Sequence, residues 1–201
     1  MKTARTVIEG ERFLHKELWR IVLRQLDHAR NIPAGAFHND LVTMTFAFHA
    51  LEAYLNYVGA KLAPDIWENE RSFFQKEPYR GFDGKIRKVL ELAGISEPDR
   101  SVRPYGTVWF LKGFRDLIAH GKTEKVAMTY EHSVEEEALW MRTPLDDLVT
   151  VENAERAHDD ILEFAQQIHN AARTKIDDVW FGSGAFDGPL QHSQGSSVIE
   201  P

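Results

Sequence analysis

The stretch from Leu41 to Leu62, LVTMTFAFHALEAYLNYVGAKL, decides the fold. Its main apolar residues recur at alternating steps of three and four, the spacing of one face of an α-helix. They are Leu41, Met44, Phe48, Leu51, Leu55, Val58 and Leu62. The apolar surface extends onto neighbouring faces of the helix through Val42, Phe46, Tyr54 and Tyr57. Because so much of the circumference is apolar, residues 38–63 are expected to form a central helix that packs on several sides or lies at a dimer interface.

Other segments repeat their apolar residues at helical steps and are also predicted to be helices. They are residues 7–30, 83–94, 104–120 and 150–175. A turn sequence from Asn31 to Gly35 ends the first helix, and Pro64 ends the second. Asp83 is expected to cap the third helix and Gly94 to close it, while Thr150 caps the last.

The rest of the chain is expected to be irregular or extended. Residues 65–81 resemble a short helical or irregular connector, and residues 123–150 are strand-like around an acidic centre, which indicates a β-hairpin or arm. Glycine and serine gather near the C-terminus, so residues 176–201 are predicted to be a flexible tail. The fold class is therefore mainly all-α: residues 1–175 form a bundle of four to five helices with a small β-hairpin inserted before the last helix.

Bulk composition narrows the class of protein. The 201 residues are 43% hydrophobic and 27% charged, which is ordinary for a globular domain. Cysteine is absent, so neither disulfides nor thiolate chemistry is available. The sequence shows no signal peptide and no long apolar run, so we expect a cytoplasmic protein without membrane contact.

A short motif at the end of the fourth predicted helix carries the candidate chemistry. Arg115, Asp116 and His120 fall within six residues, in the sequence FRDLIAHG. Asp116 and His120 are four apart and share a helix face, while Arg115 lies at the edge of the apolar stripe. Gly121 follows at the position where a left-handed residue often ends a helix. The arrangement places an imidazole that titrates near neutrality beside a permanent cation, which suits phosphate chemistry.

The net charge of −7 is unevenly distributed. Residues 100–125 carry six basic and two acidic residues, and residues 71–88 carry the same numbers. Lys112 and Lys122 lie in the first of these neighbourhoods and are candidate substrate-binding residues. Two basic neighbourhoods in an acidic chain indicate a local anion site or, alternatively, solvated helix faces.

The segment FRDLIAHG resembles the Arg-polar-x-x-x-His signature of HEPN (higher eukaryote and prokaryote nucleotide-binding) domains. The order of elements is similar too: a long aromatic-rich second helix, a variable middle, the motif helix and a closing helix. The resemblance covers about residues 7–175, although only the motif is specific. In such families the residue after the arginine is often Asn, whereas this chain has Asp116.

The resemblance implies a homodimeric, metal-independent endoribonuclease of the toxin or defence kind that needs no cofactor. His120 would act as acid or base, Arg115 would stabilise the phosphate, and Asp116 would orient the imidazole. It also implies RNA or a nucleotide as ligand and a small nucleotidyltransferase-like protein as neutralising partner. The alternative is a non-catalytic HEPN-like module that binds RNA, a nucleotide or a protein.

A metal site is a weaker alternative. Glu155 and His158 have the Glu-x-x-His spacing of di-iron carboxylate bundles, but those sites need a second such motif, and the sequence has none. His49 is expected to be a hydrogen-bonded core residue and Glu52 a buried or interfacial anchor. His158 and His169 share a helix face that is expected to be a solvated edge.

Overall fold

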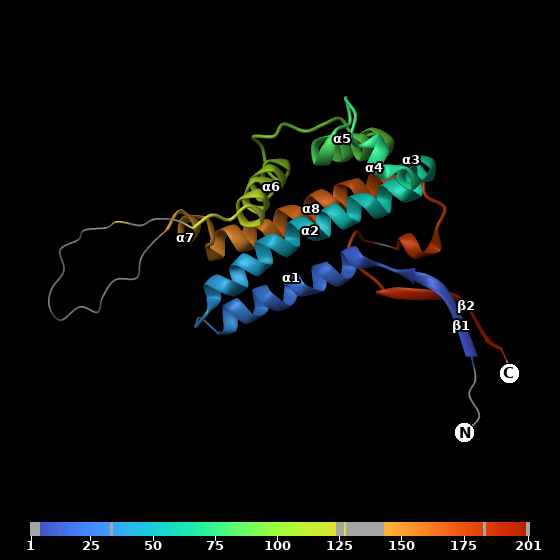
Figure 1. The fold of residues 1–201 in the computed structure, drawn as a ribbon, viewed down its shortest axis with the longest axis horizontal. Coiled ribbons are helices and arrows are strands. Elements are labelled where there is room, and N and C mark those ends of the chain that lie inside the picture. The colour runs from blue at the N-terminus through green and yellow to red at the C-terminus, as the bar shows by residue number, and fades with distance from the viewer. Residues whose placement is uncertain (1–4, 33, 124–126, 128–142, 183, 200–201) are drawn as a thin grey trace, which may run out of the picture. The chain divides into compact units, whose positions relative to one another are not determined.

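The computed structural model describes residues 5–32, 34–123, 127, 143–182 and 184–199 (Figure 1). This part of the chain contains eight α-helices, one 3₁₀-helix and one two-stranded antiparallel sheet. The predicted mainly α-helical fold is therefore confirmed. None of the helices in these described ranges is long and apolar enough to cross a membrane.

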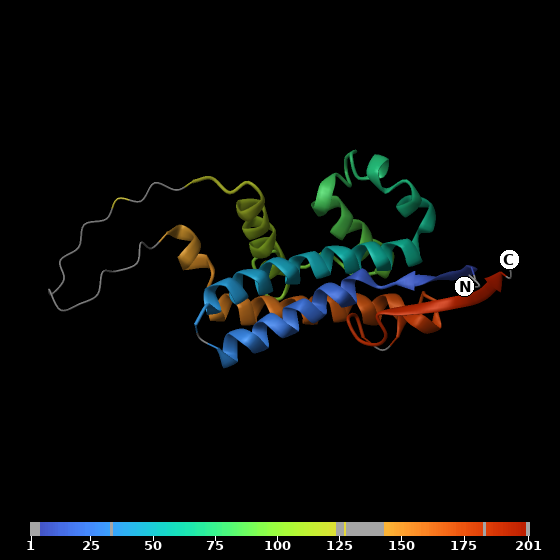
Figure 2. The ribbon, with the colours of Figure 1, turned by 60° about the horizontal axis from the view of Figure 1, so that its bottom comes forward.

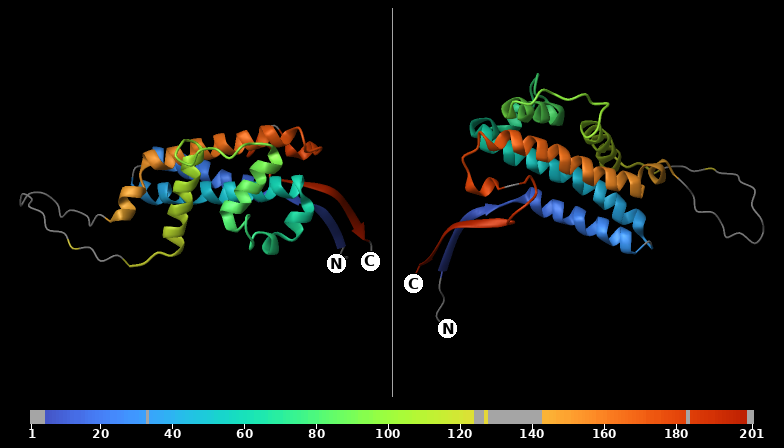
Figure 3. Two further views of the ribbon diagram at one scale, coloured as in Figure 1. Left: turned by 90° about the horizontal axis from the view of Figure 1, so that it is seen from above. Right: turned by 180° about the vertical axis from the view of Figure 1, so that it is seen from behind.

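The longest helices match the apolar periodicity closely. They are α1 (Leu14–Asn31), α2 (Ala36–Leu62) and α8 (Val151–Arg173). Thr150 caps α8 as expected, since its Oγ1 accepts the backbone N–H of Asn153 at 3.2 Å. Segments of these three helices lie side by side in each unit of the chain described below (Figure 3).

The shorter helices lie between α2 and α8 in sequence. They are α3 (Pro64–Glu68), α4 (Glu70–Phe73), α5 (Gly81–Ala93), α6 (Tyr105–Ala119) and α7 (Pro144–Leu148). The connector after Pro64 is thus helical, and Gly94 closes α5 with φ 82°, both as expected. Asp83 does not cap α5, because the helix begins earlier and places this residue in its first turn. An acidic side chain in the first turn is still stabilised by the helix dipole.

The two termini correct two predictions. The first helix was expected to begin at residue 7, but Arg5–Arg12 form strand β1, which pairs antiparallel with β2, Gln191–Ile199 (Figure 2). The predicted flexible tail is likewise wrong where it is described, since it supplies β2, the 3₁₀-helix Val179–Phe181 and buried Phe186. Each strand finds its partner about 190 residues away, and helical periodicity cannot report such a pairing.

The predicted hairpin at residues 123–150 falls mostly outside the described residues. Where this region is described, Pro144–Leu148 form helix α7 and not an arm. Thr143 and Asp146 make a capping box at its start, with Asp146 accepting from the Thr143 hydroxyl at 2.9 Å and from the Thr143 backbone N–H at 2.6 Å.

The chain divides into two compact units, each with its own core. Unit 1 comprises residues 1–20, 49–98 and 162–201, and unit 2 comprises residues 21–48 and 99–161. Helix α2 contributes buried side chains to both units. They include Met44 and Phe48 in unit 2 and Leu51, Tyr54 and Leu55 in unit 1. The expectation of an α2 that packs on several sides is confirmed.

Candidate functional site

Helix α6 carries the candidate motif in unit 2. Its buried face consists of Tyr105, Val108, Leu111 and Phe114, spaced at helical steps. Its beginning is fixed to α8 by two hydrogen-bond donors, because Arg103 and Thr107 both bind the carboxylate of Asp160. The first half of α8 therefore holds α6 in a defined rotation, which determines where the motif residues at its other end lie.

Arg115 lies at the boundary between core and solvent, as its position on the stripe predicts. Its side chain is 30% exposed, and its guanidinium carbon lies 5.2 Å from the ring centre of Phe48. A cation over an aromatic face is attracted by the ring, and this contact also restricts the rotation of the side chain. Phe48 therefore positions Arg115, a role that its place in the apolar stripe of α2 did not suggest.

Asp116 is engaged by cations of its own helix. Its carboxylate lies 3.1 Å from Nη1 of Arg115 and 3.3 Å from Nζ of Lys112. No hydrogen bond or ion pair joins the side chains of Asp116 and His120 within the described ranges, so the expected orientation of the imidazole by Asp116 does not occur there. The carboxylate instead offsets part of the positive charge at this end of α6.

His120 is the C-cap residue of α6 and is exposed to solvent. Its backbone N–H donates to the carbonyl of Asp116 at 3.1 Å, which completes the last turn. Gly121 does not adopt the left-handed conformation expected of it, and the helix ends as the backbone N–H of Gly121 bonds to the carbonyl of Ile118 at 3.2 Å. The imidazole is thus accessible from solvent at the end of the helix.

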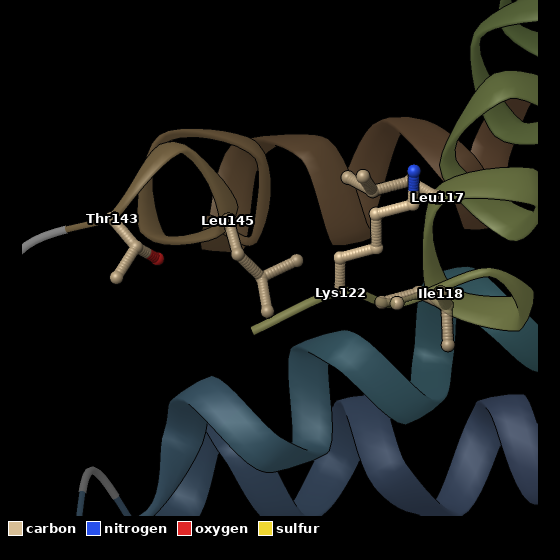
Figure 4. A pocket seen from close by; sticks show the side chains of 6 residues that line it. Leu117, Ile118, Lys122, Thr143 and Leu145 are labelled. Carbon is tan, nitrogen blue, oxygen red and sulfur yellow. The ribbon is translucent and has the colours of Figure 1, made fainter. Parts of the chain in front are cut away.

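A pocket of about 350 Å³ lies beside the end of α6 (Figure 4). The described residues that line it come from the end of α6 and the residues just after it, and from the beginning of α7. They are Leu117, Ile118, Gly121, Lys122, Thr143 and Leu145. Leu145 projects from α7 toward the end of α6, and the aliphatic stem of Lys122 runs between the two helices (Figure 4). The described lining combines apolar side chains with one cation, which fits an apolar group next to an anion.

Most cations of the two basic neighbourhoods already contact other side chains. In residues 71–88, Lys85, Arg87 and Lys88 form ion pairs with Glu70, Glu97 and Glu91. In residues 100–125, Arg100 lies 3.7 Å from the ring centre of Trp109, and Arg103 binds Asp160. Part of the local charge excess counted along the sequence is therefore offset by acidic side chains in the fold, and Lys122 is the candidate cation that lines the pocket.

The residues considered for a metal have other partners. The carboxylate of Glu155 binds Arg30 at 2.7 Å, and Nδ1 of His158 lies 2.8 Å from Asp159. His49 and Glu52 are partly exposed and lie 3.5 Å apart, so His49 is not the core residue that was expected. Each pair is explained by local charge and hydrogen bonding.

His169 corrects another prediction. It was assigned to a solvated helix edge, yet its side chain is fully buried, and its Nδ1 lies 3.1 Å from the hydroxyl of Tyr54. His169 is covered by Phe181, whose ring stacks on the imidazole at 4.2 Å. Since the covering residue comes from the C-terminal segment, the periodicity of α8 alone could not reveal the burial.

Comparison with known proteins adds no family to this description: no protein-family model, curated protein or solved structure matches the chain.

Proposed function

We propose that the chain is a metal-independent endoribonuclease of the HEPN type, with its site at the C-terminal end of α6. One observation carries the proposal: Arg115 is held over Phe48 at the edge of the core, while His120, five residues on, is exposed at the helix end. A positioned guanidinium and an accessible imidazole on one helix are the groups that cleavage of a phosphodiester by its own 2′-hydroxyl requires.

In the proposed reaction, His120 accepts the proton of the RNA 2′-hydroxyl as that oxygen attacks phosphorus. The bond from phosphorus to the 5′-oxygen breaks, which leaves a 2′,3′-cyclic phosphate and a 5′-hydroxyl. Arg115 donates hydrogen bonds to the non-bridging oxygens, whose charge grows in the transition state. A second copy across a two-fold axis supplies another His120 to protonate the leaving oxygen, so the proposed active form is a homodimer.

The test is incubation of single-stranded RNA with the purified full chain in excess chelator. We expect fragments with 5′-hydroxyl ends, and no cleavage of DNA of the same sequence, because DNA lacks the attacking hydroxyl. Arg115→Ala and His120→Ala are each expected to lower the rate at least about a hundredfold. His38→Ala, a change at another exposed histidine of unit 2, is expected to leave the rate unchanged. Wild-type protein that cleaves no RNA would remove the enzyme proposal.

A second candidate is a module that binds RNA without cleaving it. The contact of Asp116 with both Arg115 and Lys112 favours it, because the carboxylate weakens the positive field at the phosphate position. This candidate predicts that Arg115→Ala weakens binding of a labelled RNA, measured by fluorescence anisotropy. It also predicts that the bound RNA stays intact. A neutralising partner resembling a nucleotidyltransferase, as HEPN toxins commonly have, belongs to the first candidate.

A further inference from the structure

Two histidines are buried together in unit 1. His15 of α1 is 2% exposed and His169 of α8 is 0% exposed. Tyr54 of α2 lies between them: its ring is 5.5 Å from that of His15, and its hydroxyl is 3.1 Å from Nδ1 of His169. Buried imidazoles are stable only when neutral unless an acid pairs with them.

Both imidazoles are covered by the same part of the chain. The C-terminal segment, defined here as residues 178–182 and 184–193, places Phe181 flat on His169, with centroids 4.2 Å apart and planes 3° apart. The same segment brings Phe186 to 6.4 Å from His15. Phe186 also stacks on Trp19 at 4.3 Å. Lifting this segment therefore removes one aromatic ring from beside each histidine.

The cations around the imidazoles oppose their protonation. On α1, Lys16 follows His15 and is itself buried, and on α8 Arg173 lies beyond His169. The segment carries two acids: Asp187 acts on Lys16 and partly raises the pKa of His169, and Asp178 acts on Tyr57 and binds Lys61. From α2, Tyr54 and Tyr57 face the rings.

The titration of both imidazoles follows from these surroundings. Burial, reinforced by Lys16 and by His169, lowers the pKa of His15 to about 3. Burial is also the main cause that lowers the pKa of His169, although the Gly182 carbonyl raises it in part. Within the described part of the chain, Nε2 of His15 has no hydrogen-bond partner.

In the described ranges, few polar contacts hold residues 178–190 to the rest of unit 1, and one of them is to His169, whose Nε2 lies 3.4 Å from the carbonyl oxygen of Gly182. The backbone N–H of Ala185 donates to Oε1 of Gln166 at 3.1 Å, and that of Phe13 donates to the carbonyl of Leu190 at 2.8 Å. Asp178 binds Lys61 at 2.7 Å. A segment held by a few hydrogen bonds and aromatic contacts can open locally without loss of the helices.

We propose that the C-terminal segment is a pH-sensitive clasp, closed while His15 and His169 are neutral and opened when both take up protons. The sign follows from linkage: a histidine whose pKa is lowered in the closed state favours closure above its ordinary pKa of about 6.5 and loses that contribution as the pH falls. His15, whose pKa falls to about 3 in the closed state, increases the ratio of open to closed forms about tenfold per pH unit below its ordinary pKa, and His169, whose pKa is also lowered, adds to this increase.

The test is amide hydrogen exchange of residues 179–190 in the full chain, measured by mass spectrometry between pH 6 and pH 5 and corrected for the intrinsic exchange rate. We expect the protection of this segment to fall by more than about tenfold in that interval, while circular dichroism shows that the helices persist. His15→Phe keeps the ring stacking and removes one titrating group, so its protection is expected to fall by less than about tenfold.

A second change addresses the other histidine. Tyr54→Phe with His169→Phe removes both partners of one hydrogen bond, so neither is left unpaired, and is also expected to reduce the dependence to about tenfold. His38→Phe makes the same substitution at an exposed position of unit 2 and is expected to retain the wild-type dependence. The proposal is overturned by a flat wild-type profile, by a profile that neither histidine change alters, or by helix loss that coincides with opening.

Discussion

Asp160 accepts two hydrogen bonds from one arginine: Nε and Nη2 of Arg103 lie 2.7 and 2.8 Å from its two carboxylate oxygens. The carboxylate is 4% exposed, whereas the Arg103 side chain is 62% exposed. Burial alone would raise the pKa of Asp160, but the hydrogen bonds from Arg103 and Thr107 outweigh it and lower this pKa below its usual value. The pair joins the start of α6 to α8 and so fixes the helix that carries Arg115 and His120.

Arg103→Ala is expected to destabilise the protein by about 2–3 kcal/mol, because it leaves a buried carboxylate with less compensation. Urea unfolding at pH 7 measures the change. Arg12→Ala removes the exposed ion pair with Glu17 and serves as the control, with an expected effect within about 0.5 kcal/mol. Equal effects of the two substitutions would contradict a structural role for the Arg103–Asp160 pair.

Asp40→Asn is expected to stabilise the protein by roughly 1 kcal/mol at pH 7. Asp40 is 4% exposed, and burial, followed by repulsion from Glu152 and Glu155, raises its pKa. Its ionised form is therefore costly in the folded state, and that cost disappears below about pH 4, where the unfolded chain is protonated too. The difference in unfolding free energy between variant and wild type is measured at both pH values. The exposed substitution Asp177→Asn should show no such difference at pH 7.

Two helical glycines are expected to respond oppositely to alanine. A Cβ at Gly84 of α5 would lie 1.8 Å from the backbone carbonyl carbon of Tyr79, so Gly84→Ala must displace the chain and is expected to cost about 2–4 kcal/mol. At Gly113 of α6 no described atom beyond the chain neighbours and the helix's own backbone lies within 4 Å of the added atom, so Gly113→Ala should stabilise by about 0.5–1 kcal/mol. Thermal unfolding distinguishes the two signs, and a stabilised Gly84→Ala would refute the close approach.

Asp116→Asn is expected to strengthen RNA binding about two- to fivefold, because it removes the carboxylate that contacts Arg115 and Lys112. The slope of log affinity against log salt should steepen by about one released counterion. Anisotropy titrations of a labelled RNA at several salt concentrations measure both quantities. Glu163→Gln, an exposed change on α8, is the control. Unchanged affinity and slope in Asp116→Asn would show that RNA phosphate does not contact this end of α6.

Local sequence information predicted a large part of the fold. The three- and four-residue steps placed α2 and α8 to within a few residues, and the positive φ of Gly94 followed from its position after the apolar stripe of α5. The same apolar pattern placed Arg115 at the edge of the core, because this residue directly follows the buried Phe114 on the helix. These features depend only on residues within one or two helical turns.

Other features depended on distant partners. The sequence offered Asp116 as the partner of His120, but in the fold its carboxylate contacts Arg115 and Lys112, since side-chain conformation chooses among several neighbours within reach. The glycine-rich C-terminus suggested a flexible tail, yet Phe181 and Phe186 are buried against residues of α1, α2 and α8. Composition reports the average tendency of a segment and not the surface on which it packs.

By itself, the sequence determined a mainly helical chain and a helix end that carries an arginine, an aspartate and a histidine. The periodicity of apolar residues is sufficient for this because helices form from contacts close along the chain. Only the tertiary structure decided that β1 pairs with β2, that Phe48 supports Arg115, and that His15 and His169 are buried beneath one segment. These relationships join residues far apart in sequence, and packing between elements, which no local pattern encodes, brings them together.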